Sequence, residues 1–238
     1  MIITSRQNPI IKQFRSCDRD CFVVEGEKLV NEAIEAGFEP VRVLVTQKNI
    51  GKLSGVVITD ELSEYISDTK TPQGIHVLFR RKAQQYGFHP LRRVIVLDNV
   101  QDPGNVGAIL RSCEAFGWDC VILFGSGVDV FSGKVIRASA GSVFRVPVYN
   151  GDAVSDLKEA GFTIYATVLD EEAQPLNKTV FAEKSAVVIG NEGRGISKEV
   201  ISLCDKKIYI PIKGAESLNA AVAAGIICYE PGEKLCQS

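Results

Sequence analysis

Three separated segments of the chain run from an apolar stretch through small and polar residues into an amphipathic stretch. Parallel sheets bind ligands beyond the carboxyl ends of their strands, so loops of this kind are candidate binding loops. A guanidinium, a carboxylate and side-chain amides together suit a ligand with phosphate or ribose oxygens. The side chains that could do this chemistry are Asn105 and Arg111, then Glu192, then Ser217 and Asn219.

Arg111 lies outside the apolar stripe of the helix expected near 104–116. Gly107 and Gly104 precede it by one and two turns on the same face. We therefore expect no bulky side chain between the guanidinium and the start of the helix. A cation beside bare backbone, with Asn105 next to it, suits a phosphate or ribose oxygen. The alternative is an ordinary surface arginine on an amphipathic helix.

The second and third segments supply the remaining polar groups. Glu192 is the only carboxylate in a loop with three glycines, whose backbone can approach a ligand closely. A tight turn would explain the glycines, but not the pair Asn191 and Glu192 between them. In the third segment Ser217 is positioned to cap the last helix, and we expect Asn219 in the first turn of that helix.

Other kinds of site are disfavoured by spacing. The loop that begins at Gly190 reads Gly-x-x-Gly-x-Gly, which is not the dinucleotide-binding pattern Gly-x-Gly-x-x-Gly. Ile210 stands about twenty residues further on, where that pattern needs an acidic residue to bind the ribose. Neither His76 nor His89 sits in a recognisable nucleophile arrangement. The seven cysteines include no Cys-x-x-Cys pair, so we expect reduced, packed thiols and no metal site.

The strands and helices that position these residues are predicted to form two domains. Residues 22–80 predict a compact α/β unit, and the next stretch loses the apolar period and gathers charge. Beyond it strands and helices alternate, including a strand at 144–149 and a last helix from Ser217. Near-continuously apolar strands imply a mostly parallel sheet covered on both faces. The predicted divisions are a first domain at 1–82, a basic linker at 83–92 and a second domain at 93–238.

The formal net charge of -2 argues against a protein that coats nucleic acid indiscriminately. Positive charge is nevertheless concentrated beside the boundary between the two predicted domains. A solvated linker and a phosphate-binding surface are both open interpretations of this basic stretch. No apolar run approaches the roughly 18 residues of a spanning helix, and the amino terminus does not read as a secretory signal. We expect a cytoplasmic protein with no membrane partner. The cations in question are Arg80, Arg81, Lys82, Arg92 and Arg93.

Taken together, the three segments resemble the motifs of the SpoU, or TrmH-like, family of RNA ribose 2′-O-methyltransferases. The resemblance covers about 92–230, with the motifs in the family's order. Residues 22–80 are similar to the family's substrate-binding domain, a small α/β sandwich like that of certain RNA-binding ribosomal proteins. The residues that carry the match are Asn105, Gly107 and Arg111; Gly190, Asn191, Glu192 and Gly195; and Ser217, Leu218 and Asn219.

The resemblance implies a carboxyl-terminal sheet threaded into a trefoil knot, a homodimer, and S-adenosylmethionine bound in the knot. Rules of chain topology alone would give an unknotted doubly wound sheet, so the knot rests on the family. Carried over from the family, Gly190, Ile210 and Leu218 would line the cofactor site. Ala221 departs from the pattern, since relatives often carry a hydroxyl there.

The activity implied is transfer of a methyl group to a ribose 2′-hydroxyl, without a metal. Because a guanidinium is effectively always protonated, we expect Arg111 to clamp the adjacent phosphate rather than act as a base. Asn105, Glu192, Ser217 and Asn219 would orient the ribose and the arginine. RNA as substrate shifts Arg80, Arg81 and Lys82 towards phosphate contact, and these residues are expected to bind RNA.

Ribosomal RNA is the preferred substrate because the separate amino-terminal domain resembles that of the ribosomal members. Three alternatives stay open: a transfer RNA 2′-O-methyltransferase, a non-catalytic RNA-binding assembly factor with the same fold, and a nucleotide-dependent oxidoreductase.

Overall fold

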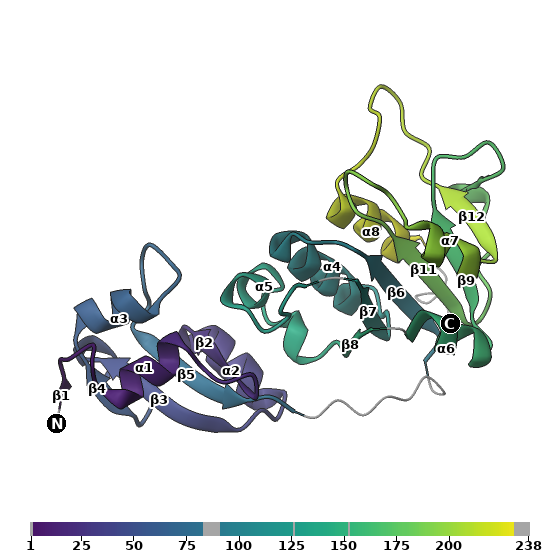
Figure 1. The fold of residues 1–238 in the computed structure, drawn as a ribbon. Coiled ribbons are helices and arrows are strands. Elements are labelled where there is room, and N and C mark those ends of the chain that lie inside the picture. Colours follow the sequence, from purple (N-terminus) through teal and green to yellow (C-terminus); the bar gives the residue numbers. More distant parts are fainter. Residues whose placement is uncertain (1, 83–90, 126, 152, 231–238) are drawn as a thin grey trace.

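The structure is a computed structural model that describes residues 2–82, 91–125, 127–151 and 153–230, with the backbone alone at Ala153. Two sheets account for the strands in these ranges: one in an N-terminal unit (2–82) and one in a C-terminal unit (91–230). Figure 1 shows them side by side, with α5 of the C-terminal unit facing the N-terminal unit. None of the helices in the described ranges combines the length and apolarity of a membrane-spanning segment.

The N-terminal unit is a mixed five-stranded sheet in the order β1-β4-β3-β5-β2. Ile11, Leu44 and Leu78 are fully buried between α1, α3 and one face of this sheet. Val24 and Val77 alternate with them and belong to the core on the opposite face. The elements are β1 (Ile2–Ile3), α1 (Pro9–Arg15), β2 (Cys21–Glu25), α2 (Glu27–Glu35), β3 (Pro40–Thr46), β4 (Val56–Ile58), α3 (Asp60–Ile66) and β5 (Ile75–Arg80), with a 3₁₀ turn at Gln47–Asn49.

The C-terminal unit is a seven-stranded sheet in the order β10-β12-β9-β11-β6-β7-β8, and every strand pair in it is parallel. Its strands are β6 (Arg93–Asp98), β7 (Cys120–Phe124), β8 (Val148–Asn150), β9 (Thr163–Thr167), β10 (Gln174–Pro175), β11 (Ser185–Ile189) and β12 (Lys206–Tyr209). Its helices are α4 (Pro103–Ala115), α5 (Gly133–Ala138), α6 (Ala153–Glu159), α7 (Lys198–Leu203) and α8 (Ala220–Tyr229), with 3₁₀ turns at Ser142–Phe144 and Leu176–Lys178.

Helices cover both faces of the C-terminal sheet. Ile95 and Leu97 of β6 pack with α4, α5 and α8, whereas Val94 and Val96 pack with α6 and α7. All four side chains are completely buried, so this central strand is apolar along its whole length. The predicted fold class, an α/β protein with a mostly parallel sheet beside a smaller amino-terminal α/β unit, is confirmed.

Two predicted elements differ from the structure. The strand expected at 144–149 is replaced by the turn at Ser142–Phe144 followed by the short strand β8. Apolar residues there are buried by the turn as well as by the strand, so hydrophobicity alone could not distinguish them. The last helix begins at Ala220, three residues after Ser217. Its cap is therefore a different side chain from the one that we expected.

An aromatic cluster joins the two units. The ring of Phe22 in β2 stacks at 4.4 Å on Phe131, which precedes α5, and Phe38 meets Phe144 edge to face at 5.7 Å. Phe22, Phe38 and Phe144 are almost fully buried. Burial of this aromatic surface stabilises one arrangement of the two sheets.

Ion pairs surround the aromatic cluster. Arg81 donates two hydrogen bonds to the carboxylate of Asp129, at 2.9 and 2.7 Å. Arg145 binds both Glu32 of α2 and Glu114 of α4, which links the N-terminal unit to the helix that carries Arg111. A bidentate pair fixes orientation as well as distance. The N-terminal unit is thereby held in a defined orientation on the C-terminal unit.

Candidate functional site

The site begins at the buried end of β6. The carboxylate of Asp98 is completely buried and accepts the backbone N–H of Ser197 at 2.5 Å and the side-chain amide of Asn99 at 2.7 Å. Because Ser197 caps α7, this carboxylate joins the first segment to the second. Sequence reasoning missed Asp98, although a carboxylate at the end of an apolar strand was a signal that could have identified it.

Asp102 fixes the start of α4. Its carboxylate accepts the backbone N–H of Asn105 at 3.0 Å, which makes it the N-cap, and it also pairs with Lys134 at 3.0 Å. The hydrogen bond from Lys134 lowers the pKa of Asp102, and the cap bond adds to this effect. Pro103 follows at the first helical position, where it needs no hydrogen-bond partner for its nitrogen. The first turn of α4 is therefore held rigidly.

Asn105 joins all three segments. Its side-chain nitrogen donates to Glu192 at 2.5 Å, and its side-chain oxygen accepts a hydrogen bond from Asn219 at 3.1 Å. The partners lie 87 and 114 positions away along the chain. Three of the predicted site residues thus form one hydrogen-bonded cluster, which we call the Asn105 cluster: Asn105, Glu192 and Asn219.

The second loop is organised by Asn191. Its side-chain oxygen accepts the backbone N–H groups of Gly193 and Arg194, at 3.0 and 3.1 Å, and its side-chain nitrogen donates to the carbonyl of Asn99 at 3.0 Å. A β-carbon at Gly190 would lie 2.3 Å from the carbonyl carbon of Gly195. Only glycine permits this close backbone approach, so the glycine predicted in the cofactor site is required by the loop itself.

A pocket of about 470 Å³ opens beside this cluster, at the carboxyl ends of β9, β11 and β12. All three residues predicted to hold the cofactor line it: Gly190, Ile210 and Leu218. Glu192 and Ser217 line it as well. The rest of the lining is mostly apolar, and includes Leu169, Ile189, Ile196, Ile201, Tyr209 and Ile212. Such a pocket suits an organic ligand with an apolar ring and a few polar groups.

The cap of α8 is Asn219 and not the predicted Ser217. Asn219 is the N-cap of α8, and its side-chain oxygen accepts the N–H groups of Ala221 and Val222 at 2.9 and 3.3 Å. Ser217 is exposed, precedes the cap by two residues and lines the pocket. The prediction that Ser217 caps the helix is therefore wrong. The amide of Asn219 does both tasks, because its nitrogen reaches Asn105 while its oxygen caps α8.

Arg111 lies on the exposed side of α4, and no described residue forms a hydrogen bond or ion pair with its guanidinium. Within this chain the guanidinium forms no hydrogen bond with the Asn105 cluster. The sequence predicts that Gly107 leaves open space beside the Arg111 guanidinium, and this prediction is wrong. Gly107 is buried against α5, where a β-carbon would lie 2.5 Å from the β-carbon of Ala138. This glycine permits two helices to touch.

An apolar stripe follows the exposed side of α8, beside α4. Val222, Ile226 and Tyr229 are 51%, 38% and 50% exposed, and their spacing of four and three residues places them on one face. The ring of Tyr229 meets Phe116, just after α4, at a centroid distance of 5.5 Å. We call Val222, Ile226 and Tyr229 the α8 stripe.

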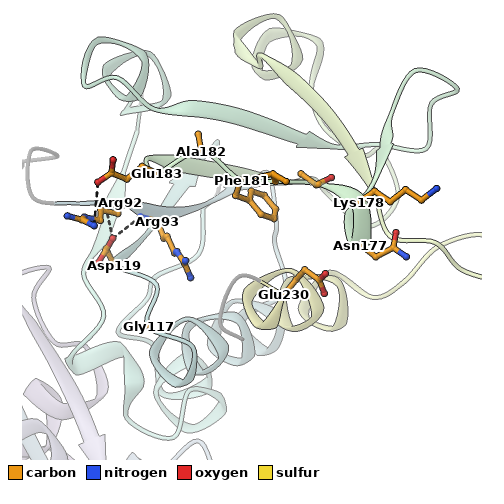
Figure 2. A pocket seen from close by; sticks show the side chains of 12 residues that line it. Arg92, Arg93, Gly117, Asp119, Asn177, Lys178, Phe181, Ala182, Glu183 and Glu230 are labelled. Atoms are coloured by element: carbon orange, nitrogen blue, oxygen red, sulfur yellow. Dashed lines mark hydrogen bonds and ion pairs between the residues drawn. The ribbon is translucent and has the colours of Figure 1, made fainter. Parts of the chain in front are cut away.

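A second cavity of about 460 Å³ lies at the opposite edge of the sheet (Figure 2). Arg93 at the start of β6 lines it, together with Gly117, Asp119 and Phe181. The backbone N–H of Arg93 donates to Asp119 at 2.7 Å. Because the cavity is at the amino-terminal end of β6, it is separate from the Asn105 cluster at the carboxyl end.

The cations predicted to contact RNA have different surroundings. Arg80 is exposed at the end of β5. Arg81 is committed to the bidentate pair with Asp129, and Lys82 donates to the carbonyl of Ala36 at 2.7 Å and lies over the ring of Phe38. RNA would have to displace these intramolecular partners. The predicted RNA contacts stay predictions, with Arg80 the most available of the three.

The cysteines of the described ranges are free thiols. Burial raises the pKa of Cys204 to about 11, and the pKa of Cys113 is raised by its hydrogen bond with Cys228 and by burial. These thiols therefore stay protonated at neutral pH. In the same ranges the structure shows no cluster of His, Cys, Asp and Glu that could hold a metal ion. His89 and Cys236, and most of the predicted linker at 83–92, lie outside the described residues.

These features define a class of protein. It is an α/β protein with a parallel C-terminal sheet, and the loops after β6, β11 and β12 meet beside a pocket at the carboxyl edge of that sheet. Residues 92–229 match the model of the SpoU rRNA Methylase family. The chain belongs to this family.

Similar proteins cover the whole chain. It is 34% identical over 218 residues to the 23S rRNA (guanosine(2553)-2′-O)-methyltransferase RlmP of Bacillus subtilis, and the match covers 87% of each chain. It is 30% identical to the 23S rRNA (uridine(2479)-2′-O)-methyltransferase of Streptomyces viridochromogenes, over 88% of this chain and 81% of that protein. The crystal structure of the AdoMet-bound rRNA methyltransferase from Sinorhizobium meliloti superposes with a TM-score of 0.87 at 28% identity, and covers 99% and 98% of the two chains.

Family membership confirms the resemblance of the three segments, which was predicted from Asn105, Glu192, Asn219 and their neighbours. It also confirms the predicted class of enzyme, an RNA methyltransferase. A nucleotide-dependent oxidoreductase does not fit this membership.

Proposed function

We propose that this protein transfers a methyl group from S-adenosylmethionine to a ribose 2′-hydroxyl of ribosomal RNA. The observation that carries the proposal is the Asn105 cluster, which joins the three motif segments beside a pocket of about 470 Å³. The relatives from Bacillus subtilis and Streptomyces viridochromogenes are named as 23S rRNA methyltransferases, which favours ribosomal over transfer RNA.

The pocket fits S-adenosylmethionine. Gly190 contributes backbone without a side chain to the lining, and apolar side chains such as Ile210 and Leu218 suit the adenine ring. Backbone groups of these residues would hold its polar atoms. When bound, S-adenosylmethionine supplies a methyl group already activated by the sulfonium. The protein then has to position the 2′-hydroxyl and assist removal of its proton.

We assign the RNA side of the site to five residues. Asn105, Glu192 and Asn219 hold one another in place and orient the ribose, and the exposed Ser217 at the pocket rim contacts it. Arg111 binds the phosphate next to the target ribose and stabilises the developing negative charge on the 2′-oxygen. Its free guanidinium is available for this role, since no described residue pairs with it.

The helices α4 and α8 also bear on the proposed quaternary structure. We propose a homodimer in which the α8 stripe is covered by a second copy of the chain, because the exposed apolar side chains lie beside α4 and the Asn105 cluster. Such a dimer places Arg111 of α4 at or near the interface, where it can act on RNA bound to either subunit.

The segment between β12 and α8 forms the trefoil knot of the family. Residues 1–82 form an RNA-binding domain, 83–92 the linker and 93–238 the methyltransferase domain, and the enzyme works in the cytoplasm.

The direct test is incubation with labelled S-adenosylmethionine and separated ribosomal and transfer RNA, followed by nucleoside analysis and mapping. We expect a single 2′-O-methylated nucleotide in the large ribosomal RNA. Labelling of transfer RNA alone would show that the substrate is transfer RNA and not ribosomal RNA. If neither RNA is labelled and calorimetry shows no S-adenosylmethionine binding, the protein is a non-catalytic RNA-binding factor.

Arg111→Lys tests the assignment of the phosphate clamp. Lysine keeps the charge but cannot form the two parallel hydrogen bonds of a guanidinium. We expect kcat to fall by at least about tenfold, because one charge-assisted hydrogen bond in the transition state is lost. S-adenosylmethionine affinity should be unchanged, and a variant that keeps most of kcat would contradict a bidentate clamp.

A further inference from the structure

Only one charged residue lies within one turn of Arg111 on the same face of α4. The positions three and four residues away on either side share that face, and they hold Gly107, Ala108, Glu114 and Ala115. An arginine and a glutamate three residues apart on an exposed helix face attract each other. A pair of Arg111 with Glu114 would occupy the guanidinium that the proposed function assigns to a phosphate.

Arg111 and Glu114 are nevertheless not paired. No described residue forms a hydrogen bond or ion pair with the guanidinium of Arg111. Both carboxylate oxygens of Glu114 accept hydrogen bonds from Arg145 instead, Oε1 from Nε and Oε2 from Nη2 at 3.1 Å. These hydrogen bonds lower the pKa of Glu114 below its ordinary value, so the carboxylate is charged at neutral pH. Its charge is therefore compensated by Arg145 and not by Arg111.

The third nitrogen of the Arg145 guanidinium binds the N-terminal unit. Nη1 donates to the carboxylate of Glu32 in α2, so all three nitrogens have carboxylate partners. The side chains of Arg145, Glu32 and Glu114 are 39%, 26% and 33% exposed. Water and salt screen partly buried charges less than fully exposed ones. The loss of one member would therefore leave a charge whose effect extends to its neighbours.

The backbone on either side of Arg145 is fixed by packing. Phe144 and Val146 are almost fully buried. Gly141 has a φ of +92°, in the left-handed region that favours glycine, and a β-carbon there would lie 3.4 Å from the β-carbon of Glu32. Helix α2 therefore packs directly on the turn at Ser142–Phe144. Arg145 is held at a position from which it reaches both α2 and α4.

We propose that Arg145 is a positioning residue for the methyl transfer, because it binds Glu114 and so keeps the Arg111 guanidinium free for the RNA phosphate. Without Arg145, the carboxylate of Glu114 would be uncompensated one helical turn from Arg111. It would compete with the phosphate for Arg111 and would also repel the phosphate. The inference rests on the proposed function, in which Arg111 binds the phosphate next to the target ribose.

The first test compares Arg145→Met with the double variant Arg145→Met/Glu114→Gln, in the full chain and with the mapped RNA fragment as substrate. We expect kcat/KM for RNA to fall roughly fivefold in Arg145→Met, the effect of one uncompensated charge near the bound phosphate. The double variant should return to within about twofold of wild type, because the competing charge is gone. Both variants lack the bond to Glu32, so a loss caused by looser docking of the two units would be equal in both.

Salt dependence and a matched variant separate charge from docking. Salt screens the repulsion between Glu114 and the phosphate, so the deficit of Arg145→Met relative to wild type should shrink as salt is added. Glu32→Gln is the matched control, because it removes the bond between the units but leaves Arg145 on Glu114. Its kcat/KM should stay within about twofold of wild type. The Kd of S-adenosylmethionine should be unchanged in all these variants.

Ala115→Glu tests the same idea while Arg145 keeps both of its partners. Ala115 is exposed and lies four residues after Arg111, so the new carboxylate would share the face of that arginine. We expect kcat/KM for RNA to fall roughly fivefold. Ala115→Gln has nearly the same size without the charge and should behave as wild type.

Three results would overturn the inference. Arg145→Met could be fully active, the double variant could be as impaired as Arg145→Met, or Ala115→Glu could be as active as Ala115→Gln. In each case the wild-type protein still methylates RNA and binds S-adenosylmethionine, so the proposed function would stand.

Discussion

At the scale of single residues, Asn105 is the centre of the site because both of its amide atoms are used. Asn105→Ala removes the donor to Glu192 and the acceptor for Asn219 together. We expect kcat to fall by about 10- to 100-fold, because the ribose-orienting groups lose their fixed positions. The residue is not part of the pocket lining, so the Kd of S-adenosylmethionine should stay within about threefold of wild type. Single-turnover methylation and calorimetry measure the two quantities.

Asn219 combines a structural and a functional role, and two substitutions separate them. Asn219→Ser keeps an N-cap oxygen for Ala221 but loses the nitrogen that donates to Asn105. Asn219→Ala loses both. We expect both variants to lower kcat and only the alanine variant to lower the free energy of unfolding, by about 1 kcal/mol. Equal activity of the serine variant and wild type would show that the bond to Asn105 is not needed.

Sequence reasoning identified Asn105, Glu192 and Asn219 because a parallel sheet brings the carboxyl ends of its strands to one edge. It could not give their hydrogen bonds, which depend on side-chain directions at partners 87 and 114 positions away. The cap was placed on Ser217 because serine and asparagine have nearly equal capping preference. Only the backbone at Asn219 decides between them.

At the scale of elements, glycine spacing was misread as a ligand feature. Gly107 lies in a helix, so neither turn geometry nor a positive φ marks it, and its contact with α5 is absent from the local sequence. A strand at 144–149 was expected for a similar reason, because buried turns and buried strands have the same apolar composition. Packing between elements decides such positions, whereas periodicity describes one element at a time.

Gly107→Ala tests the close contact of α4 with α5. The new β-carbon would lie 2.5 Å from Ala138 and 2.9 Å from backbone atoms of Val135 and Ser139, so the helices must separate. We expect a loss of about 2 kcal/mol in the free energy of unfolding, as for other overpacked interiors. Urea unfolding measures it.

Gly225→Ala in α8 is the matched control for that substitution. Its β-carbon would lie 3.6 Å from the hydroxyl oxygen of Ser112 in α4, an ordinary contact. Alanine is the better helix former, so this variant should gain about 0.5 to 1 kcal/mol. If both variants lost the same amount of stability, helix contact would not be the reason for glycine at 107.

At the scale of the whole molecule, the orientation of the two units depends on contacts that no motif announces. Phe22 and Phe131 stack although they are far apart in sequence and belong to different sheets. The basic stretch at 80–82 indicated phosphate binding, yet Arg81 and Lys82 hold the units and the first sheet together. Charge composition cannot tell a solvated cation from one paired with a distant carboxylate.

The pair of Arg81 and Asp129 makes the joining of the units depend on pH. Burial opposes ionisation of Asp129, but hydrogen bonds from Arg81 and the N–H of Phe131 outweigh it and lower the pKa of the carboxyl. A lowered folded pKa gives stability that is complete above the unfolded value of about 4 and is lost as pH falls through the folded value. Arg81→Met should therefore lower Tm by about 2 to 4 °C at pH 7, the effect of roughly 1 kcal/mol. The difference in Tm between Arg81→Met and wild type should shrink below pH ~4.

Lys82→Met is the control, because Lys82 binds a carbonyl and not a carboxylate, and its effect on Tm should not change over this pH range. A deficit of Arg81→Met that persists at pH ~3 would show that the arginine acts through packing on Phe131 rather than through charge.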